Sequence, residues 1–435
     1  MIKNKLALFG GKKVRNKDFL NPWFFDKKET KAVLSVLKSN ELSGFLAFKG
    51  KKFFGGKKVL ELESAFEKHY KIKHALAIQS ATAGLHAAIA ACDLEPGDEV
   101  ICTPYSMIAS ATAAIMHNAI PIFADIDPIN FNICPKSFKK FINKKTKAII
   151  VVHLFGYPAE MNEIMKIAKD NNIYVIEDCA QAPDALYRNK FVGTIGDIGV
   201  FSFNQNKTIT CGEGGIVLTN NNELAKRLEL IRNHGEVVVD KYPVKSISGI
   251  IGYNYRMTEI EAAIALEQFK KLKKLNNHRI RLAKYLTQKL KKFGDLFQLP
   301  ATGCEKCLND CKSKHVYFVY PFKYNCKVLN LSRDLFAKAL QAEGFPVTIG
   351  YLRPIYLEPM YQKLKAYGKK GFPFKGPHIS KKIQYKKGIA PVCERMHFKE
   401  LLFTNICRYP LTEKDMDGFV EAIQKIIKNV DEFKK

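Results

Sequence analysis

The feature that most restricts the fold of this chain is a regular alternation of two kinds of segment between residues 70 and 235. Short apolar runs rich in β-branched residues include HALAIQ, IPIFADID, KAIIVVHLF and IYVIED. Between them lie helix-like stretches, which include TAGLHAAIAACD and EMNEIMKIAKDNN. The runs predict buried strands and the stretches predict helices, so the alternation indicates an α/β fold with a largely parallel sheet and helices on both faces. Ligands of such sheets bind at the carboxyl ends of the strands.

The remainder of the chain is organised differently. Thr258 and Glu261 form the pattern of a capping box, which predicts the start of a long helix. It is followed by a strand-like HVYFVYPF, a helix-like SRDLFAKALQAEG and a closing helix EKDMDGFVEAIQKIIKN, which indicate a smaller α+β domain. We therefore expect an N-terminal arm over residues 1–28, a large domain over 29–285 and a small C-terminal domain over 286–435.

Composition and charge restrict the class of protein. Hydrophobic residues make up 47% of the 435 residues and charged residues 26%, as in folded globular proteins. No apolar run approaches the roughly 18 residues that span a bilayer, and the N-terminal segment lacks the apolar core of a signal peptide, so we expect a cytoplasmic protein with no membrane partner. A net charge of +28 would suit nucleic acid, but the lysines are scattered and form no long basic tail. A lysine-rich composition, or an attraction for phosphorylated substrates, explains the charge more simply.

The cysteines give one candidate metal site. Without a secretion signal, the 11 cysteines are most simply reduced thiols. In CEKCLNDCKSKH, four soft ligands, Cys304, Cys307, Cys311 and His315, are close enough in sequence to hold zinc. Against zinc, His315 opens a strand-like run and the last spacings match no known zinc motif. Loop cysteines are the favoured interpretation, and no metal is predicted.

A turn that suits a phosphate lies in IQSATAGLH. The strand breaks at Ser80 and a helix begins near Thr82. Small residues leave the first backbone N–H groups of the helix open, and the helix dipole adds partial positive charge, so this turn suits an anion. An ordinary helix cap is the alternative interpretation of the same residues.

The segment YVIEDCAQA carries two further candidates. Asp178 closes an apolar strand, which predicts a carboxylate at the ligand-binding edge of the sheet. Such an acid caps the following turn or pairs with a cationic heterocycle. Gln181 is near enough in sequence to reach the same site and donate to a ring oxygen; otherwise it is a surface amide.

Lys207 lies in GDIGVFSFNQNKTITCGEGGIVLTNN, where two strand-like runs flank a polar turn. Ser202 lies in the first run and Lys207 just beyond it. An amine in a partly desolvated pocket loses its proton more readily and becomes a nucleophile toward carbonyls. Alone, Lys207 would be interpreted as one more solvated lysine. Its place after a phosphate turn, an aromatic residue, a strand-end Asp and a Ser, and before a glycine-rich turn, favours a functional role.

Seven motifs in order resemble those of the DegT/StrS-type sugar aminotransferases, a pyridoxal-phosphate-dependent family of fold type I. They are SATAGLH, GDEVICTPY, IEDCAQA, FSFNQNK, GEGG, RNHG and GYNYRMTEIEAAIALEQF. The resemblance covers nearly the entire chain. It implies an aspartate-aminotransferase-like fold with a mixed, mostly parallel sheet, a smaller α+β C-terminal domain, and a homodimer whose two active sites lie at the interface.

The resemblance also implies the catalytic roles. Lys207 would form the Schiff base with pyridoxal 5′-phosphate and, once released, would shuttle a proton at the α-carbon of the amino donor. Asp178 would pair with the pyridine nitrogen and keep it protonated. Gln181 matches the position beside the ring hydroxyl. Tyr105 matches an aromatic residue that stacks on the ring face; the alternative is a core tyrosine.

Four further positions match the family's phosphate site. Thr82, Ala83 and Ser202 fall where these enzymes bind the phosphate group. Asn254, in GYNYRM, matches a residue that reaches the phosphate from the partner subunit; the alternative is a turn asparagine before the capped helix.

The reaction implied is transfer of an amino group from glutamate, or glutamine, to a keto-sugar, most often a nucleotide-linked one used in polysaccharide or glycan biosynthesis. Alternatives are an aminotransferase for a keto-inositol or another free keto-sugar, and a sugar dehydratase of the same fold. Dehydratases typically carry histidine in place of the lysine, so Lys207 argues for transamination. A nucleic-acid-binding protein with an inactive enzyme fold is disfavoured by the intact lysine, aspartate and glycine-rich turn.

Overall fold

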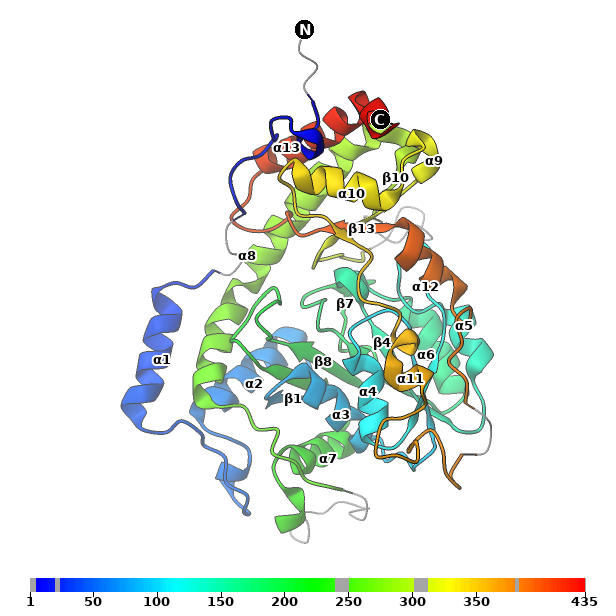
Figure 1. Cartoon of the computed structure of the whole chain (residues 1–435). Coiled ribbons are helices and arrows are strands. Elements are labelled where there is room, and N and C mark those ends of the chain that lie inside the picture. The colour runs from blue at the N-terminus through cyan, green and yellow to red at the C-terminus, as the bar shows by residue number, and fades with distance from the viewer. Residues whose placement is uncertain (1–4, 20–23, 239–249, 301–311, 380–382, 435) are drawn as a thin grey trace.

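The computed structural model describes residues 5–19, 24–238, 250–300, 312–379 and 383–434 (Figure 1). A seven-stranded sheet lies in the lower half of the molecule in the view of Figure 1, with strand order β1-β9-β8-β5-β4-β2-β3. Its strands are β1 (His74–Ile78), β2 (Glu99–Cys102), β3 (Ile120–Phe123), β4 (Thr146–Val152), β5 (Tyr174–Asp178), β8 (Ile198–Ser202) and β9 (Gly215–Thr219).

This sheet is mixed and mostly parallel, as predicted. The strands β3, β2, β4, β5 and β8 run parallel to one another, whereas β9 runs antiparallel to both β8 and β1. The reversal at β9 is consistent with the connection between β8 and β9, residues 203–214, which contains no helix, whereas a crossover to a parallel strand usually runs through one. The turn between these two strands carries Lys207.

Helices cover both faces of the sheet because alternate strand residues point to opposite sides. In β4, Ala148 and Ile150 belong to one core cluster, and Ile149 and Val151 belong to the other. The first cluster includes side chains of α3 (Ala81–Ala91), α4 (Ala109–Met116) and α7 (Asn222–Arg232). The second includes side chains of α2 (Lys57–Tyr70), α5 (Pro135–Phe141), α6 (Met161–Asp170) and α8 (Glu259–Leu290).

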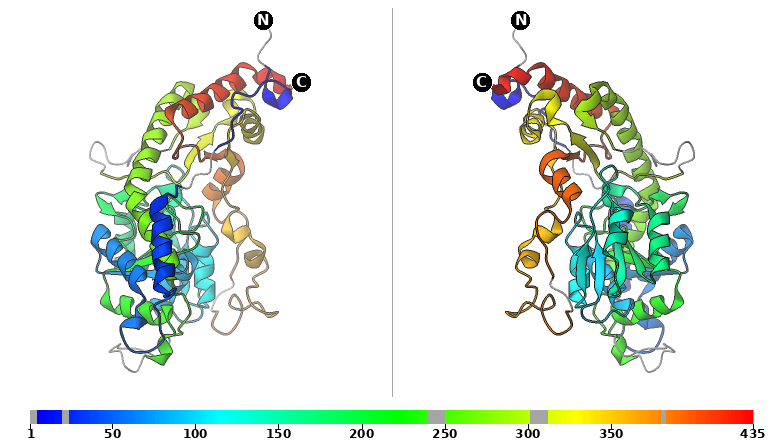
Figure 2. Two further views of the ribbon diagram at one scale, coloured as in Figure 1. Left: turned by 90° about the vertical axis from the view of Figure 1, so that its left-hand side faces the viewer. Right: turned by 90° about the vertical axis from the view of Figure 1, so that its right-hand side faces the viewer.

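The long helix α8 begins where its cap was predicted. The side chain of Thr258 accepts from the backbone of Glu261, and the Glu261 carboxylate accepts from the backbone of Thr258. The helix α1 (Lys27–Ser39) packs along it. From the lower half of the molecule α8 rises to the upper half (Figure 2), so one continuous helix connects the two sheets.

The upper half contains a four-stranded antiparallel sheet with order β10-β11-β13-β12. Its strands are β10 (Phe297–Gln298), β11 (Tyr320–Tyr324), β12 (Thr348–Ile349) and β13 (Leu401–Thr404). The longer helices beside it are α10 (Arg333–Ala342) and α13 (Glu413–Lys428). The remaining short elements are β6 (Leu186–Tyr187), β7 (Lys190–Phe191), α9 (Cys326–Leu329), α11 (Pro359–Gln362) and α12 (Pro391–Arg395). No helix of the described residues combines the length and the hydrophobicity that a membrane span requires.

The prediction of a strand over HVYFVYPF is wrong for the first part of this run, residues 315–319. Only Tyr320–Tyr324 forms a strand. Tyr317 adopts a positive φ of 50°, a conformation that interrupts a strand. The N–H groups on either side of it, those of Val316 and Phe318, donate to the carbonyls of Gly156 and Phe155. This segment therefore pairs with a turn of the lower half and brings Phe318 toward the sheet edge.

A long segment after β12 returns to the lower half of the molecule. Figure 2 shows it descending beside the parallel sheet. The N–H of Ile355 donates to the carbonyl of Pro104, and Tyr385 donates its hydroxyl to the carbonyl of Pro121. The rings of Tyr356 and Tyr385 pack on Phe123 of β3. Part of the range expected for the small domain thus packs on the edge of the large sheet, near the ends of its strands.

Candidate active site

The carboxyl ends of β5 and β8 and the N-terminus of α3 enclose a cavity of about 350 Å³. Such a volume lies at the lower end of the roughly 300–1,000 Å³ typical of small-molecule sites. Four of the predicted site residues line it, namely Thr82, Asp178, Ser202 and Lys207. The C-terminal part of the chain adds Phe318 and Tyr351 to the wall.

The N-terminus of α3 forms one side of the cavity. Ser80 is extended and caps the helix, since its Oγ accepts from the N–H of Ala83 at 3.1 Å. The N–H groups of Ala81 and Thr82 precede the first intrahelical hydrogen bond, and both residues line the cavity. The N–H of Ala83 is used by the cap and Ala83 is not part of the lining, whereas Ala81 is. The phosphate contact predicted for Ala83 stays a prediction.

Close approach of β9 sets the position of this turn. A Cβ added to Gly215 would lie 2.9 Å from the nitrogen of Ala81 and 2.8 Å from the carbonyl oxygen of Phe201. Real side chains do not tolerate such contacts, so glycine is required here. It lets the strand after the Lys207 turn lie directly against the start of α3.

Asp178 is the last residue of β5 and is almost completely buried. Its Oδ2 accepts from Ser110 Oγ at 2.8 Å, and its Oδ1 accepts from the N–H of Ala180 at 3.1 Å. Ser110 lies on α4. These two bonds fix the carboxylate and still leave lone pairs for a cationic partner in the cavity.

Lys207 lies in the turn between β8 and β9, where its N–H donates to the carbonyl of Asn204 at 2.9 Å. Its Nζ lies 5.0 Å from the centroid of the Phe318 ring. Burial lowers the pKa of Lys207, although the carboxylate of Asp178 acts in the opposite direction. A lowered pKa increases the fraction of neutral amine, which is the nucleophilic form.

Neither Gln181 nor Tyr105 is itself part of the cavity lining. Gln181 is nonetheless next to the cavity, because it follows Ala180 in sequence and is hydrogen-bonded to Tyr351, and both of these residues line it. Gln181 is buried and its Nε2 donates to the hydroxyl of Tyr351 at 3.3 Å. Tyr105 is fully buried, and its hydroxyl accepts from the N–H of Tyr351 at 2.6 Å. Met107, two residues after Tyr105 in the sequence, lines the cavity and is 54% exposed. The expected stacking of Tyr105 on a ring in the cavity is therefore corrected: its ring belongs to the core and Met107 faces the space.

Asn254 is exposed and lies outside the cavity lining of its own chain. Its Oδ1 accepts from Arg256 Nε at 2.7 Å, and its backbone pairs with Asn233. The resemblance places this residue in the site of the partner subunit, and that role stays a prediction.

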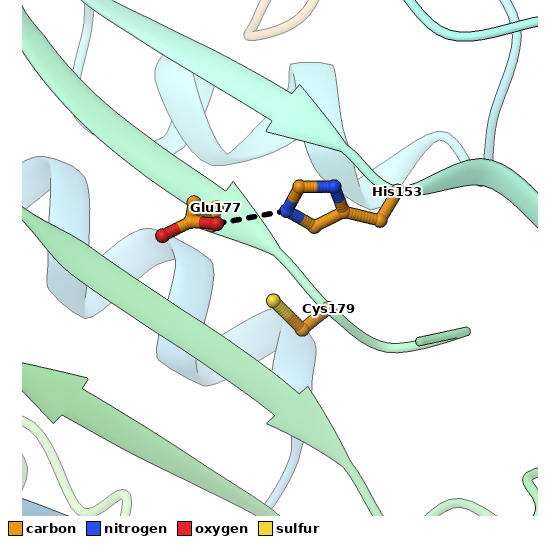
Figure 3. Close-up of side chains that lie close together, drawn as sticks. All are labelled: His153, Glu177 and Cys179. Carbon is orange, nitrogen blue, oxygen red and sulfur yellow. Dashed lines mark hydrogen bonds and ion pairs between the residues drawn. The ribbon is translucent and has the colours of Figure 1, made fainter. Parts of the chain in front are cut away.

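A second polar cluster lies on the opposite face of the sheet, where Figure 3 shows His153, Glu177 and Cys179 together. All three are buried and their potential ligand atoms lie within 4.8 Å of one another. His153 Nδ1 accepts from the N–H of Ala159, so Nε2 carries the proton and donates to Glu177 at 2.9 Å. Both ring nitrogens are thus used within the protein, and this cluster is structural.

The candidate zinc ligands Cys304, Cys307 and Cys311 lie outside the described residues. His315 is described, and its Nε2 lies 3.1 Å from the carbonyl oxygen of Phe155. Its ring stacks on Tyr317 with centroids 3.7 Å apart. This histidine therefore contributes to packing between the turn after β4 and the segment before β11.

Besides Met107, the residues that shape the cavity and that sequence reasoning missed include Ser110, Glu213, Phe318 and Tyr351. Glu213 lies in the glycine-rich turn and accepts from Asn204 Nδ2 at 2.8 Å. Its place in GEGG was a usable signal. Ser110 lies on a helix of small residues, and Phe318 lay in a run interpreted as a strand. Nothing in the local sequence of Tyr351 marks it.

The residues present fit pyridoxal 5′-phosphate. The uncapped N–H groups of Ala81 and Thr82 suit a phosphate, and the anchored carboxylate of Asp178 suits a protonated pyridine nitrogen. Lys207, with its lowered pKa, supplies an amine for the aldehyde in the same cavity. All three parts come from one cavity whose volume suits a single small molecule.

Comparison with known proteins gives an independent result. Residues 38–383 match the model of the DegT/DnrJ/EryC1/StrS aminotransferase family. The chain is 36% identical to a GDP-perosamine synthase from Caulobacter vibrioides over 71% of this chain and 80% of the relative. It is 30% identical to an L-glutamine:2-deoxy-scyllo-inosose aminotransferase from Streptoalloteichus tenebrarius over 98% of both. An aminotransferase structure from Psychrobacter cryohalolentis is similar with a TM-score of 0.81 and 30% identity, over 95% of this chain and all of that one.

Proposed function

Since this chain belongs to the DegT/DnrJ/EryC1/StrS aminotransferase family, we propose that it transfers an amino group from glutamate or glutamine to a nucleotide-linked keto-sugar. The chain is a pyridoxal-phosphate-dependent sugar aminotransferase, and the proposal concerns its donor, its acceptor and the residues that act. Similarity to GDP-perosamine synthase supports a nucleotide-linked acceptor, for use in polysaccharide or glycan biosynthesis.

One observation carries the assignment of the site. Lys207 and Asp178 line the same cavity, and the open N-terminus of α3 lines it as well. An amine, an anchored carboxylate and an anion-binding turn are the three groups needed to hold the aldehyde, the ring nitrogen and the phosphate of the cofactor. A dehydratase typically lacks this lysine, so its presence supports transamination.

When bound, pyridoxal 5′-phosphate would supply an aldehyde carbon that can carry the amino group and an electron-withdrawing ring that stabilises negative charge at the α-carbon of the donor. Lys207 Nζ would hold the aldehyde carbon in the resting enzyme and, when free, would move a proton to and from the α-carbon of the donor. Asp178 would hold a proton on the ring nitrogen, and Gln181 would donate to the ring oxygen. Thr82 and Ser202 would hold the phosphate together with the N–H of Ala81.

The proposed active form is a cytoplasmic homodimer in which Asn254 of each chain completes the phosphate site of its partner. Exposure of Asn254 on the described chain is compatible with such a contact. Light scattering of the purified protein measures the assembly, and Asn254→Ala then weakens cofactor binding while the dimer persists. A monomer with full activity contradicts this part of the proposal.

A keto-inositol is the second candidate acceptor. The observation that favours it is the match to the 2-deoxy-scyllo-inosose aminotransferase, which extends over 98% of both chains, whereas the match to the GDP-perosamine synthase covers 71% of this chain. A nucleotide-linked acceptor carries an anionic nucleoside diphosphate that a free keto-inositol lacks, and the positive net charge of +28 would attract that group over long range.

A donor and acceptor panel tests the proposal. The purified protein is loaded with pyridoxal 5′-phosphate and offered glutamate, glutamine or alanine, and loss of the visible absorbance of the cofactor reports the first half-reaction. Nucleotide-linked keto-sugars and 2-deoxy-scyllo-inosose are then added separately, and amino products are detected by mass spectrometry. We expect glutamate or glutamine to react and a nucleotide-linked sugar to be aminated. Amination of the inositol alone selects the second candidate, and release of water without amination indicates a dehydratase.

A further inference from the structure

Gln181 has a fixed amide orientation. Its Oε1 accepts from the buried N–H of Phe155 at 2.8 Å. This bond decides which end of the amide is which, so Nε2 lies on the other side. One N–H of Nε2 donates to the hydroxyl of Tyr351 at 3.3 Å, which leaves the second N–H for another acceptor.

Tyr351 comes from the C-terminal part of the chain, yet it lines the cavity that contains Lys207 and Asp178. It follows β12, in the segment that returns from the upper sheet to the lower half of the molecule. The phenol is therefore the point at which that segment reaches the side chains of the candidate active site.

Buried contacts hold Tyr351 in place. Its N–H donates to the hydroxyl of Tyr105 at 2.6 Å, and that hydroxyl lies 3.0 Å from Nδ1 of His397. Its ring meets those of Phe155 and Phe403 edge to face, with centroids 5.4 and 6.0 Å away. The hydroxyl of Tyr351 is therefore presented to Gln181 from a rigid ring.

The charge state of Tyr351 is also fixed. Burial, aided by the negative charge of Asp178, raises the pKa of Tyr351 to about 12. The phenol is thus protonated at neutral pH, accepts from Gln181 and keeps its own proton to donate.

We propose that Tyr351 is a positioning residue of the active site, which holds the amide of Gln181 so that its second N–H is directed to the ring oxygen of the bound cofactor. The inference rests on the proposed function. It gives the C-terminal segment a role beyond closing the cavity, because the segment sets the orientation of a side chain of the large domain.

Tyr351→Phe tests the inference, because it removes the hydroxyl and keeps the ring. We expect pyridoxal 5′-phosphate to bind the apo-protein about three- to tenfold more weakly, the effect of losing one neutral hydrogen bond. The visible circular dichroism of the bound cofactor changes, since it reports how the ring is held. Thermal unfolding of the apo-protein stays close to that of the wild type.

A double-mutant cycle separates positioning from packing. If Tyr351 acts through Gln181, Tyr351→Phe has no further effect on cofactor affinity in a Gln181→Met background. The matched control is Tyr361→Phe. Tyr361 is a fully buried tyrosine of the same segment, and its hydroxyl has no hydrogen-bond partner among the described residues. This control leaves both the affinity and the circular dichroism unchanged.

Two failures are distinguishable. If the wild-type apo-protein does not bind pyridoxal 5′-phosphate, the proposed function fails and the inference fails with it. If the wild type binds, but Tyr351→Phe binds equally well with the same circular dichroism, only the inference is overturned. Additive losses in the double mutant overturn it as well.

Discussion

Glu177 and Asp178 are consecutive residues of β5, yet their carboxylates have different surroundings. Glu177 points to one face of the sheet, where it is completely buried and accepts from His153 and from three backbone N–H groups of residues 193–196. Asp178 points to the other face, where Ser110 and Ala180 supply two hydrogen bonds and a cavity lies beside it.

The difference teaches how to separate a structural charge from a functional one. Burial does not do so, because both carboxylates are buried. The number of internal partners does: Glu177 has four donors and organises a loop, whereas Asp178 keeps lone pairs for a ligand. One face of the strand thus contributes to stability and the other to the proposed chemistry. Substitutions on the two faces are therefore expected to affect different quantities, the free energy of unfolding and the reaction rate.

The largest effect is expected for Lys207→Ala on the cavity face. Without the amine, neither attachment of the aldehyde nor proton transfer at the donor is possible, so the rate of amino transfer falls by about 10⁴-fold or more. Steady-state assay with saturating cofactor measures it. The control is Lys190→Ala, which removes an exposed lysine of β7 and leaves the rate unchanged. Retention of a tenth of the activity by Lys207→Ala contradicts the assigned role.

The next largest effect is expected for Glu177, on the face of the sheet opposite the cavity, and it concerns the stability of the protein. Glu177→Ala removes the acceptor of His153 and of three backbone N–H groups, and unpaired buried donors cost about 1–3 kcal/mol each before relaxation and water entry. We expect the free energy of unfolding of the apo-protein to fall by about 3–5 kcal/mol, measured by urea denaturation. Asp178→Asn is the comparison, with a loss below about 1 kcal/mol because the amide retains an oxygen for one of its donors. Equal losses of unfolding free energy in Glu177→Ala and Asp178→Asn would contradict the distinction between a structural and a functional carboxylate.

The next effect is expected on the reaction rate of Asp178→Asn. An amide does not stabilise a proton on the ring nitrogen, so the rate falls by about 10²–10³-fold, the range for loss of one preorganised electrostatic partner. Single-turnover reaction with glutamate measures this step. Ser110→Ala loosens the carboxylate without removing its charge and is expected to cost less than Asp178→Asn. The reverse order of the two rates argues against an electrostatic role of Asp178.

Local sequence patterns predicted the parts of the site that depend on local structure. The apolar run that ends at Asp178, the helix that begins after Ser80 and the turn that contains Lys207 all form where expected. Each is specified by a few neighbouring residues, through strand periodicity, a side-chain cap or a glycine-rich turn. The resemblance to a family then supplied the roles that these patterns alone left open.

The rest depends on contacts between distant segments. Tyr351 and Phe318 reach the cavity only because the C-terminal part packs on the lower half, and no periodicity reports this. Tyr105 was expected in the cavity because the family resemblance matched it to an aromatic residue that stacks on the cofactor ring. The irregular turn after β2 instead directs Tyr105 into the core and Met107 outward. Side-chain direction in such a turn is set by partners far along the chain, here the backbone of Tyr351.

The smallest effect is a pH dependence that only the cavity face should produce. Burial lowers the pKa of Lys207 below its ordinary value of 10.5, partly opposed by Asp178, whereas the unfolded chain keeps the ordinary value. Below the lowered pKa, both states hold the proton and the cost of burying the charge is present in full. Between the lowered pKa and 10.5, the unfolded chain binds more protons, so the free energy of unfolding rises with pH across this window.

Lys207→Met lacks the titrating group, so the stability of the wild type relative to this variant should increase with pH, measured by urea denaturation of both apo-proteins. The control Lys190→Met removes an exposed lysine instead, and its stability relative to the wild type is expected to show no such trend. A constant difference between wild type and Lys207→Met would mean that the amine is solvated rather than held in the cavity.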